Sequence, residues 1–223
     1  NYHEPQIGKA ALKLLTDCGY AVELAEVGCC QRPKISHGLL GQAKKDGKAT
    51  AQGLDVFFQK DIPVLVCEPS CASALVDDLP DLLEDDAIAK RMGQSVFMID
   101  VFLAKEQAKG TFQIELSSEA KQILVHGHCH QKAMFGTKAM NGLLGQAATV
   151  EEIPSGCCGM AGSFGYEKEH FALSEKIGEQ VLFPAIRQSN GSEIVACGFS
   201  CRHQIAHFTD KKAKHWVELV QVK

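Results

Sequence analysis

Hydrophobic residues recur along this chain in two patterns, one typical of amphipathic helices and one of short buried strands. Between residues 5 and 18 apolar side chains return every three or four positions, which predicts a helix that Gly19 ends. The run PVLVC at 63–67 is apolar throughout and predicts a buried strand. The same criteria predict helices at 39–58 with a break near Gly47, 80–108, 131–144, 169–187 with a bend at Pro184, and 198–208. They predict further strands at 21–24, 123–126, 149–153 and 193–196.

The order of these elements repeats along the chain. Cys29 and Cys157 lie 128 positions apart, and Cys71 and Cys201 lie 130 positions apart. Each half contains a helix, a strand, a Cys-Cys turn, a helix, an apolar strand and a Ser-Cys pair that opens a helix, with Ser70 as a predicted N-cap. Strands that alternate with helices form parallel sheets. We therefore predict an α/β fold of two similar Rossmann-like halves.

The predicted halves are residues 1–110 and 119–223, with a connector around 109–118. We expect them to be related by a pseudo-twofold axis and to face each other, with any metal centre at their interface. Because functional groups collect at the carboxyl ends of parallel strands, both Ser-Cys segments fall where such a centre is expected.

The first half of the repeat is incomplete. Cys129 lies 28 positions before Cys157, whereas the same step back from Cys29 reaches Asn1. The strand predicted at 123–126 has no counterpart in the first half, because the counterpart would precede residue 1. The chain also does not begin with methionine, so we expect it to be part of a longer protein.

Composition narrows the function classes. The chain has 223 residues, of which 45% are hydrophobic, and a net charge of -4, so no broad basic surface indicates nucleic acid. It has no apolar run of about 18 residues that could span a membrane. The first residues are polar and contain no signal peptide. We expect a cytoplasmic location, with the inner face of the membrane as an alternative.

Ten cysteines are many for a chain of this kind, and four of them form two Cys-Cys pairs. Adjacent cysteines do not easily bond to each other, but both can present thiolates to one inorganic centre. The pair Cys157 and Cys158 lies in the glycine-rich run GCCGMAGSFG, whose backbone can approach a bulky group closely. This pattern favours metal or redox chemistry over buried structural thiols or disulfides.

Charged and imidazole side chains flank the cysteines. Three cations could balance the negative charge of a thiolate site, although surface charge is the alternative for each: Arg32, Lys132 and Arg202. Three histidines surround Cys129, and the latter two could ligate metal or form local hydrogen bonds: His126, His128 and His130. Cys18, on the apolar face of the first helix, is predicted to be a core residue.

The cysteine pattern resembles the cysteine-rich CCG domain, which occurs in heterodisulfide reductase and in the iron–sulfur subunit of glycolate oxidase. The segments NYHEP, CCQRPKISHGLL, EPSC, HGHCHQKA, IPSGCCGMAGSFGYE and GFSCRHQI most resemble the carboxyl-terminal part of FAD-linked 2-hydroxyacid dehydrogenases. The resemblance covers nearly the whole chain. It implies electron transfer through an iron–sulfur centre, which in some members is a noncubane four-iron cluster held by five cysteines.

The resemblance also implies the cluster ligands. In the second half they are Cys129, Cys157, Cys158 and Cys201, and in the first half, less completely, Cys29, Cys30 and Cys71. The family's last pair is often C-x-x-C, but this chain has Glu68 and Gly198 at the first position of that pair. Cys67 and Cys197 lie one residue earlier, which places them on the opposite face of a strand, so we predict both to be core thiols.

These observations predict the electron-transfer part of a flavin-linked oxidoreductase with a 4Fe-4S-type cluster, acting on a 2-hydroxy acid such as glycolate, lactate or 2-hydroxyglutarate. The chain lacks a G-x-G-x-x-G run after a strand, so FAD is expected on other sequence or a partner subunit. The expected partners are a flavin-binding domain or subunit, a ferredoxin-like domain and a membrane-associated electron acceptor. Two alternatives remain open: a zinc-binding structural or interaction module, with zinc also a possible substitute for the cluster, and a thiol–disulfide oxidoreductase.

Overall fold

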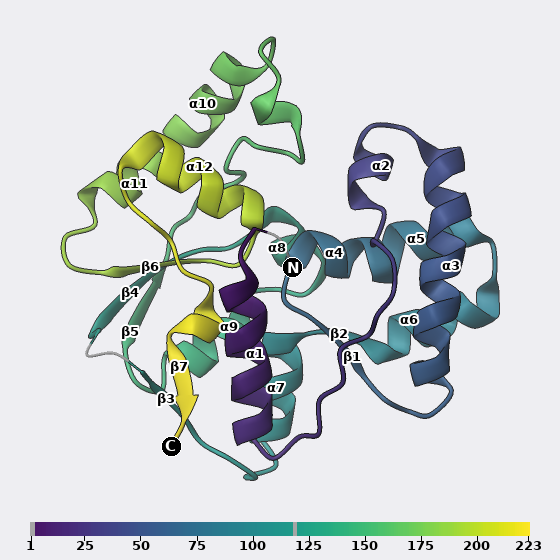
Figure 1. The fold of residues 1–223 in the computed structure, drawn as a ribbon. Helices are drawn as coiled ribbons and strands as arrows, with labels where there is room; N and C mark the ends of the chain where they lie inside the picture. The colour runs from purple at the N-terminus through teal and green to yellow at the C-terminus, as the bar shows by residue number, and fades with distance from the viewer. Residues whose placement is uncertain (1–2, 118–119) are drawn as a thin grey trace. The chain divides into compact units, whose positions relative to one another are not determined.

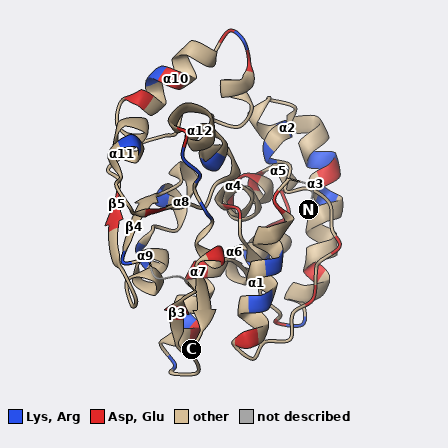
Figure 2. Cartoon of the chain, turned by 60° about the vertical axis from the view of Figure 1, so that its left-hand side comes forward, with Lys and Arg blue, Asp and Glu red and all other residues tan. Residues whose placement is uncertain are grey.

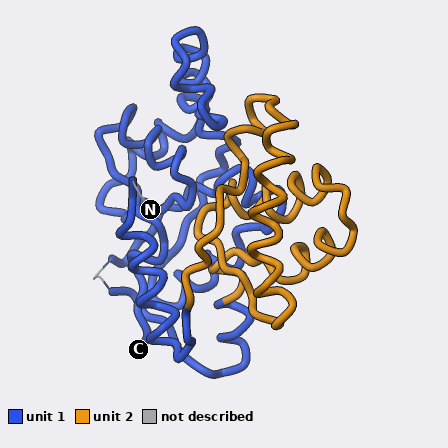
Figure 3. Tube along the Cα trace, turned by 45° about the vertical axis from the view of Figure 1, so that its right-hand side comes forward, with its two compact units in different colours: residues 1–22, 103–223 blue, residues 23–102 orange. Residues whose placement is uncertain are grey.

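The computed structural model of this protein describes residues 3–117 and 120–223. The chain divides into two compact units, shown in Figure 3: unit 1 comprises residues 1–22 and 103–223, and unit 2 comprises residues 23–102. Asn1, which the repeat aligns with Cys129, lies outside the described residues. The division into halves at 1–110 and 119–223, and a centre between them, stay predictions.

A parallel three-stranded sheet forms the centre of unit 1 (Figure 1). Its middle strand is β4 (Gln122–His126), which pairs with β5 (Thr149–Glu152) on one side and β6 (Glu193–Ala196) on the other. Residues 123–126 of β4 are all buried, as expected for a strand covered on both faces. This sheet confirms the predicted α/β class with parallel strands.

The helices of unit 1 follow the predicted order with two corrections. The helix predicted at 131–144 is two helices, because Gly136 turns the chain at a φ of +74° between them. The helix predicted at 169–187 breaks at Gln180 and Val181, and Pro184 lies in the first turn of the next helix, where its missing N–H leaves no bond unmade. The helices are α1 (Pro5–Asp17), α8 (Cys129–Met134), α9 (Lys138–Leu144), η2 (Phe164–Tyr166), α10 (Phe171–Glu179), α11 (Leu182–Gln188), α12 (Phe199–Thr209) and η3 (Trp216–Glu218).

Unit 1 also contains an antiparallel pair that the hydrophobic pattern did not predict. Strand β3 (Ile114–Leu116), within the expected connector, pairs with β7 (Val220–Val222). Helix α1 contacts both β7 and η3, so the beginning and the end of the chain pack together. Figure 1 shows α1 beside these elements near the C-terminus.

Unit 2 is built around two parallel strands, β1 (Val64–Val66) and β2 (Val96–Met98). Its helices are α2 (Arg32–Ser36), α3 (Leu40–Phe58), α4 (Pro69–Ser73), η1 (Ala74–Asp78), α5 (Leu79–Leu83) and α6 (Asp86–Ser95), after which α7 (Ile99–Gln107) leads into unit 1. Helix α3 runs through Gly47 without the expected break. It carries lysines and aspartates interspersed along its length, as Figure 2 shows.

Three local predictions for unit 2 were wrong. Residues 21–24 form no strand, since they have no ladder partner among the described residues. Residues 96–98, predicted as helix, form β2 because they pair with β1. The N-cap of α4 is Glu68, and the Ser70 hydroxyl donates a hydrogen bond to the Glu68 carboxylate at 2.7 Å.

The strand pairing carries the repeat offset seen in the sequence. Leu65 in β1 pairs with Phe97, and Val195 in β6 makes a parallel bridge to Lys214. Val195 lies 130 positions after Leu65 (195 minus 65), the same offset that separates Cys71 from Cys201. The apolar strand before each Ser-Cys helix therefore has a parallel neighbour at the equivalent residue.

Candidate metal centre

Three strand ends of unit 1 bring the predicted cysteines of the second half to one place. Strand β4 leads into Cys129, which opens α8, and β5 leads into the turn with Cys157 and Cys158. Strand β6 leads into α12, where Cys201 is the third residue. Because the three strands are parallel, their carboxyl ends share one edge of the sheet.

The four thiols form a continuous row, which we call the thiol row: Cys129, Cys157, Cys158 and Cys201. Hydrogen bonds between side chains link Cys129 to Cys157, Cys157 to Cys158, and Cys158 to Cys201. Cys129 is exposed and Cys157 is half-buried, whereas Cys158 and Cys201 are only 4% and 1% exposed. The row therefore runs from the surface into the hydrophobic core of unit 1.

Protons alternate along the thiol row. Hydrogen bonds from the neighbouring thiols lower the pKa of Cys157 and of Cys201. The same contacts, together with burial, raise the pKa of Cys129 and of Cys158. Thiols in such close contact resist ionising together because their charges repel, and a bound cation removes that resistance. The row is thus a set of soft donors that a metal can deprotonate.

The turn that presents Cys157 and Cys158 is fixed from several sides. The Gly159 backbone N–H donates to the Cys157 sulfur at 3.3 Å, at a φ of +93° that favours glycine. The Ser174 hydroxyl donates to the Gly159 carbonyl at 2.8 Å. The Gln204 amide donates to the Cys158 carbonyl at 3.1 Å and to the Ser174 hydroxyl at 2.7 Å. Helices α10 and α12 thereby hold the turn in place.

The two cations predicted in this half hold backbone carbonyls beside the cysteines. Lys132 donates to the carbonyls of Ser155 and Gly156, just before the Cys-Cys pair. Arg202 is 6% exposed, and it donates to the carbonyls of Ala196 and Cys197 at 2.8 and 2.7 Å. Both cations therefore act as positioning groups.

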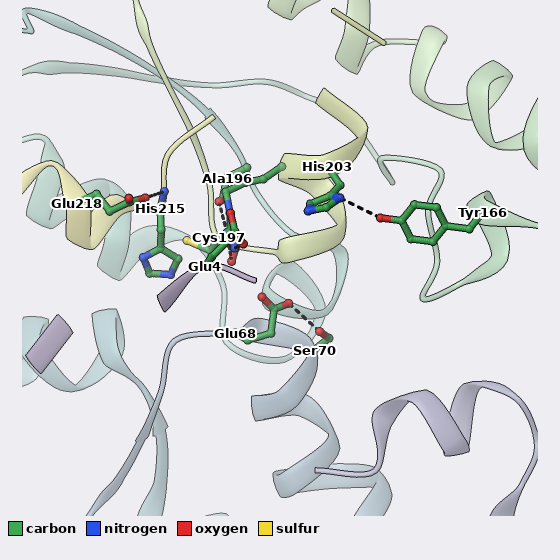
Figure 4. A network of polar contacts seen from close by, with 10 residues as sticks. Glu4, Glu68, Ser70, Tyr166, Ala196, Cys197, His203, His215 and Glu218 are labelled. Carbon is green, nitrogen blue, oxygen red and sulfur yellow. Dashed lines mark hydrogen bonds and ion pairs between the residues drawn. The ribbon is translucent and has the colours of Figure 1, made fainter. Parts of the chain in front are cut away.

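Arg202 is also tied to the beginning of the chain. Its guanidinium forms a two-point ion pair with Glu4, at 2.9 and 2.5 Å. Figure 4 shows Glu4 beside Ala196 and Cys197, at the end of β6. The carboxylate compensates the charge of a guanidinium that would otherwise be buried without a counterion.

The histidines around Cys129 have different environments. His126 ends β4, is 1% exposed and shares a 2.8 Å hydrogen bond between its Nδ1 and the Ser155 hydroxyl. The ligand atoms of His126, Cys158 and Cys201 all lie within 4.8 Å of one another. His128 caps α8 by accepting from the His130 N–H at 3.1 Å. Sequence reasoning favoured His128 and His130 as ligands; the signal it missed is a polar residue that ends a fully buried strand.

The remaining cysteines lie apart from the thiol row. Cys197 is 1% exposed and its thiol contacts the Met140 sulfur at 3.2 Å, as a core residue should. Cys67 and Cys18 are half-buried, so neither is the fully buried core thiol that was predicted. Gly198 has a steric reason to be glycine, since a Cβ there would lie 2.1 Å from the His128 ring.

Unit 2 brings its three cysteines together in a smaller set. The Cys30 side chain is hydrogen-bonded to those of Cys71 and Cys29, and the contact with Cys71 lowers the pKa of Cys30 to about 7. Arg32 adds to that shift and donates to the Ser70 carbonyl at 3.3 Å. Like Lys132 and Arg202, it holds backbone next to a cysteine.

A cleft of about 650 Å³ opens beside α12 in unit 1. Met160 and Gln204 line it, and Gln204 is the residue that binds the Cys158 carbonyl. On its outer side the Tyr166 hydroxyl and the His203 ring share a 3.0 Å hydrogen bond, drawn in Figure 4. A single layer of side chains thus separates the cleft from the buried end of the thiol row.

Comparison with known proteins places this chain near dehydrogenases. No protein-family model matches it. It is 28% identical over 226 residues to one of the subunits of anaerobic glycerol-3-phosphate dehydrogenase from Escherichia coli (strain K12), which covers 99% of the chain and 56% of that protein. It is 24% identical over 220 residues to D-2-hydroxyglutarate dehydrogenase of Pseudomonas putida, covering 98% of the chain and 21% of that protein. The chain therefore spans about half the length of the first relative and about a fifth of the second.

The donor set fits an iron–sulfur centre. Four thiols converge, a backbone N–H already donates to one sulfur, and the two deepest thiols are shielded from water. Soft thiolates select iron–sulfur clusters and zinc over hard cations such as magnesium. No helix of the described residues is both long and apolar enough to cross a membrane.

Proposed function

We propose that this chain is the electron-transfer portion of a flavin-linked oxidoreductase and holds one four-iron cluster in the second half. The observation that carries the proposal is the thiol row, whose cysteines come from three separate strand ends. The ligands are Cys129, Cys157, Cys158 and Cys201.

The relatives support electron transfer rather than substrate binding. Proteins named for glycerol 3-phosphate and for 2-hydroxyglutarate match nearly the same residues of this chain. A segment shared by dehydrogenases with different substrates is suited to the step that they have in common. The organic substrate, a 2-hydroxy acid in our prediction, and the FAD would then bind to other sequence or a partner subunit.

Each residue of the site has a role in this proposal. The cluster, when bound, accepts and releases single electrons. The Gly159 N–H and the cations nearby stabilise negative charge on the sulfurs, which raises the reduction potential. Lys132 and Arg202 fix the backbone that carries Cys157 and Cys201, so that the ligands stay in place as the charge changes. The cleft beside α12 is suited to the approach of an electron-transfer partner.

The expected partners are a flavin-binding domain or subunit and a ferredoxin-like domain that connects the flavin to this centre. The final acceptor in the proposal is membrane-associated. The protein would then work in the cytoplasm, at the inner face of the membrane.

A zinc site is the second candidate, and one observation favours it. The ligand atoms of His126, Cys158 and Cys201 lie within 4.8 Å of one another. Two thiolates on one tetrahedral zinc ion, each bound at about 2.3 Å, are about 3.8 Å apart. The same donors could therefore hold a single ion in a structural or interaction module.

Metal analysis of anaerobically purified chain distinguishes these functions. Iron with equal acid-labile sulfide and visible absorption supports the cluster, and zinc alone after anaerobic reconstitution with iron and sulfide refutes it. A protein that takes neither metal but cycles a disulfide would be the thiol–disulfide oxidoreductase.

Single substitutions identify the ligands. Cys157→Ser, Cys158→Ser and Cys201→Ser should each abolish the visible absorption of reconstituted protein. Cys18→Ser is the matched control, because Cys18 lies at the end of α1, outside the thiol row, and should leave the absorption intact. Full iron retention in Cys158→Ser would refute the assignment.

A further inference from the structure

His126 has an environment that an ordinary core histidine does not need. It is 1% exposed at the end of β4, and its ring is held by the hydrogen bond from Nδ1 to Ser155. Its second ring nitrogen, Nε2, is buried and has no nitrogen or oxygen partner among the described residues. A buried polar atom left in this state is costly unless something binds it.

The atoms that face this ring are sulfurs. Ligand atoms of His126, Cys158 and Cys201 lie within 4.8 Å of one another, and all three residues are buried. These two cysteines form the deep end of the thiol row. The imidazole therefore points into the donor set that we propose for the cluster, on the side away from exposed Cys129.

The hydrogen bond to Ser155 has the form found behind metal-bound histidines. A ligating histidine usually donates its other ring N–H to a nearby oxygen, which fixes the tautomer and turns the free nitrogen toward the metal. Nδ1–H donating to the Ser155 oxygen would leave the lone pair on Nε2. Ser155 is itself held in position, since its carbonyl accepts from Lys132 and its N–H donates to the Ile153 carbonyl at 2.7 Å.

We propose, building on the proposed function, that His126 binds the same metal centre through Nε2, as a fifth protein ligand beside the four thiolates. The position that a further cysteine would occupy is Gly198, where a side chain would collide with the His128 ring. A neutral imidazole adds a donor without adding negative charge. Replacing thiolate by imidazole on iron raises the reduction potential of a cluster.

Pulsed electron paramagnetic resonance on the reconstituted chain tests the proposal, in whichever oxidation state is paramagnetic. The wild type should show strong coupling to a directly bound nitrogen. His126→Cys should retain iron and sulfide within about 20% of the wild type but lose this coupling, and its reduction potential should fall because a neutral donor becomes anionic. His203→Ala, at an exposed position on α12, is the matched control and should keep the coupling.

The result separates the ligand from the function. A wild-type cluster without nitrogen coupling, or coupling that persists in His126→Cys, overturns the role of His126 and leaves the cluster standing. A wild type that takes only zinc refutes the four-iron function. X-ray absorption at the zinc edge then still tests His126: one nitrogen in the first shell supports it, and a shell of sulfur alone overturns it.

Discussion

Gly159 offers a sharp test of how the Cys-Cys turn is built. Its φ is +93°, and a Cβ at this position would lie 2.2 Å from the Ser174 carbonyl oxygen. The obstacle is backbone of α10, which cannot rotate away as a flexible side chain could. Gly156 begins the same turn, and a Cβ there would meet nothing within 4 Å. Gly159→Ala and Gly156→Ala are therefore a matched pair.

The expected cost of Gly159→Ala has two parts. Forcing an alanine into a positive φ costs about 1–2 kcal/mol. Displacing the Ser174 backbone costs about 1–3 kcal/mol more, as for other overpacked sites. We expect a loss of about 2–5 kcal/mol in the free energy of unfolding, against about 0.5 kcal/mol or less for Gly156→Ala.

Unfolding of metal-free protein in urea provides the assay, with the fluorescence of Trp216 as the probe. Trp216 is the single tryptophan and is fully buried in unit 1, so it reports on the unit that holds the thiol row. Gly159→Ala should also bind less iron, since the same turn carries Cys157 and Cys158. If both variants unfold at the same urea concentration, the argument from the Ser174 contact is wrong.

Three further predictions concern other parts of the structure. Burial tends to raise the pKa of Glu4, but hydrogen bonds and charge from Arg202 lower it below 4.5 overall, so the pair stabilises the fold above about pH 4.5 and the stabilisation is lost as pH falls through the lower folded-state pKa. Glu4→Gln should cost about 1–3 kcal/mol at pH 7 and show a weaker acid dependence in urea titrations; an unchanged acid limb would contradict this. Cys67→Ala and Cys197→Ala should each cost on the order of 1 kcal/mol but little iron, and loss of half the iron would show that we misread the strand register. The halves should bind metal unequally, with about four irons per chain. A count near eight that depends on the first-half cysteines would overturn this prediction: Cys29, Cys30 and Cys71.

The hydrophobic pattern predicted the elements that position the candidate site. Strands β4, β5 and β6 fall within one or two residues of the predicted runs, because each is short, apolar and bounded by polar turns. The Ser-Cys segments do open helices or lie in their first turn. Parallel pairing then follows from the alternation of strands and helices, and it is sufficient to bring the thiol row together.

The errors arose where a neighbour decides the structure. Residues 21–24 have a strand-like sequence, but a strand needs a partner, and the described residues supply none. The run 96–104 is apolar throughout, so its period could not distinguish β2 from the helix that follows. His126 was undervalued for a related reason, since its surroundings come from the turn at Ser155 and from α12, both distant in sequence.

The discontinuity of unit 1 bears on the order in which the protein can fold during synthesis. Unit 2 is one continuous segment, residues 23–102, and all of it has left the ribosome before the second half is made. Unit 1 needs α1, made first, to meet η3 and β7, made last, and Glu4 must find Arg202 across 198 positions. Contacts of such long range form slowly, because closing the intervening loop costs entropy first. Until then α1 would remain without its partners, although it is the first helix of this sequence to be synthesised.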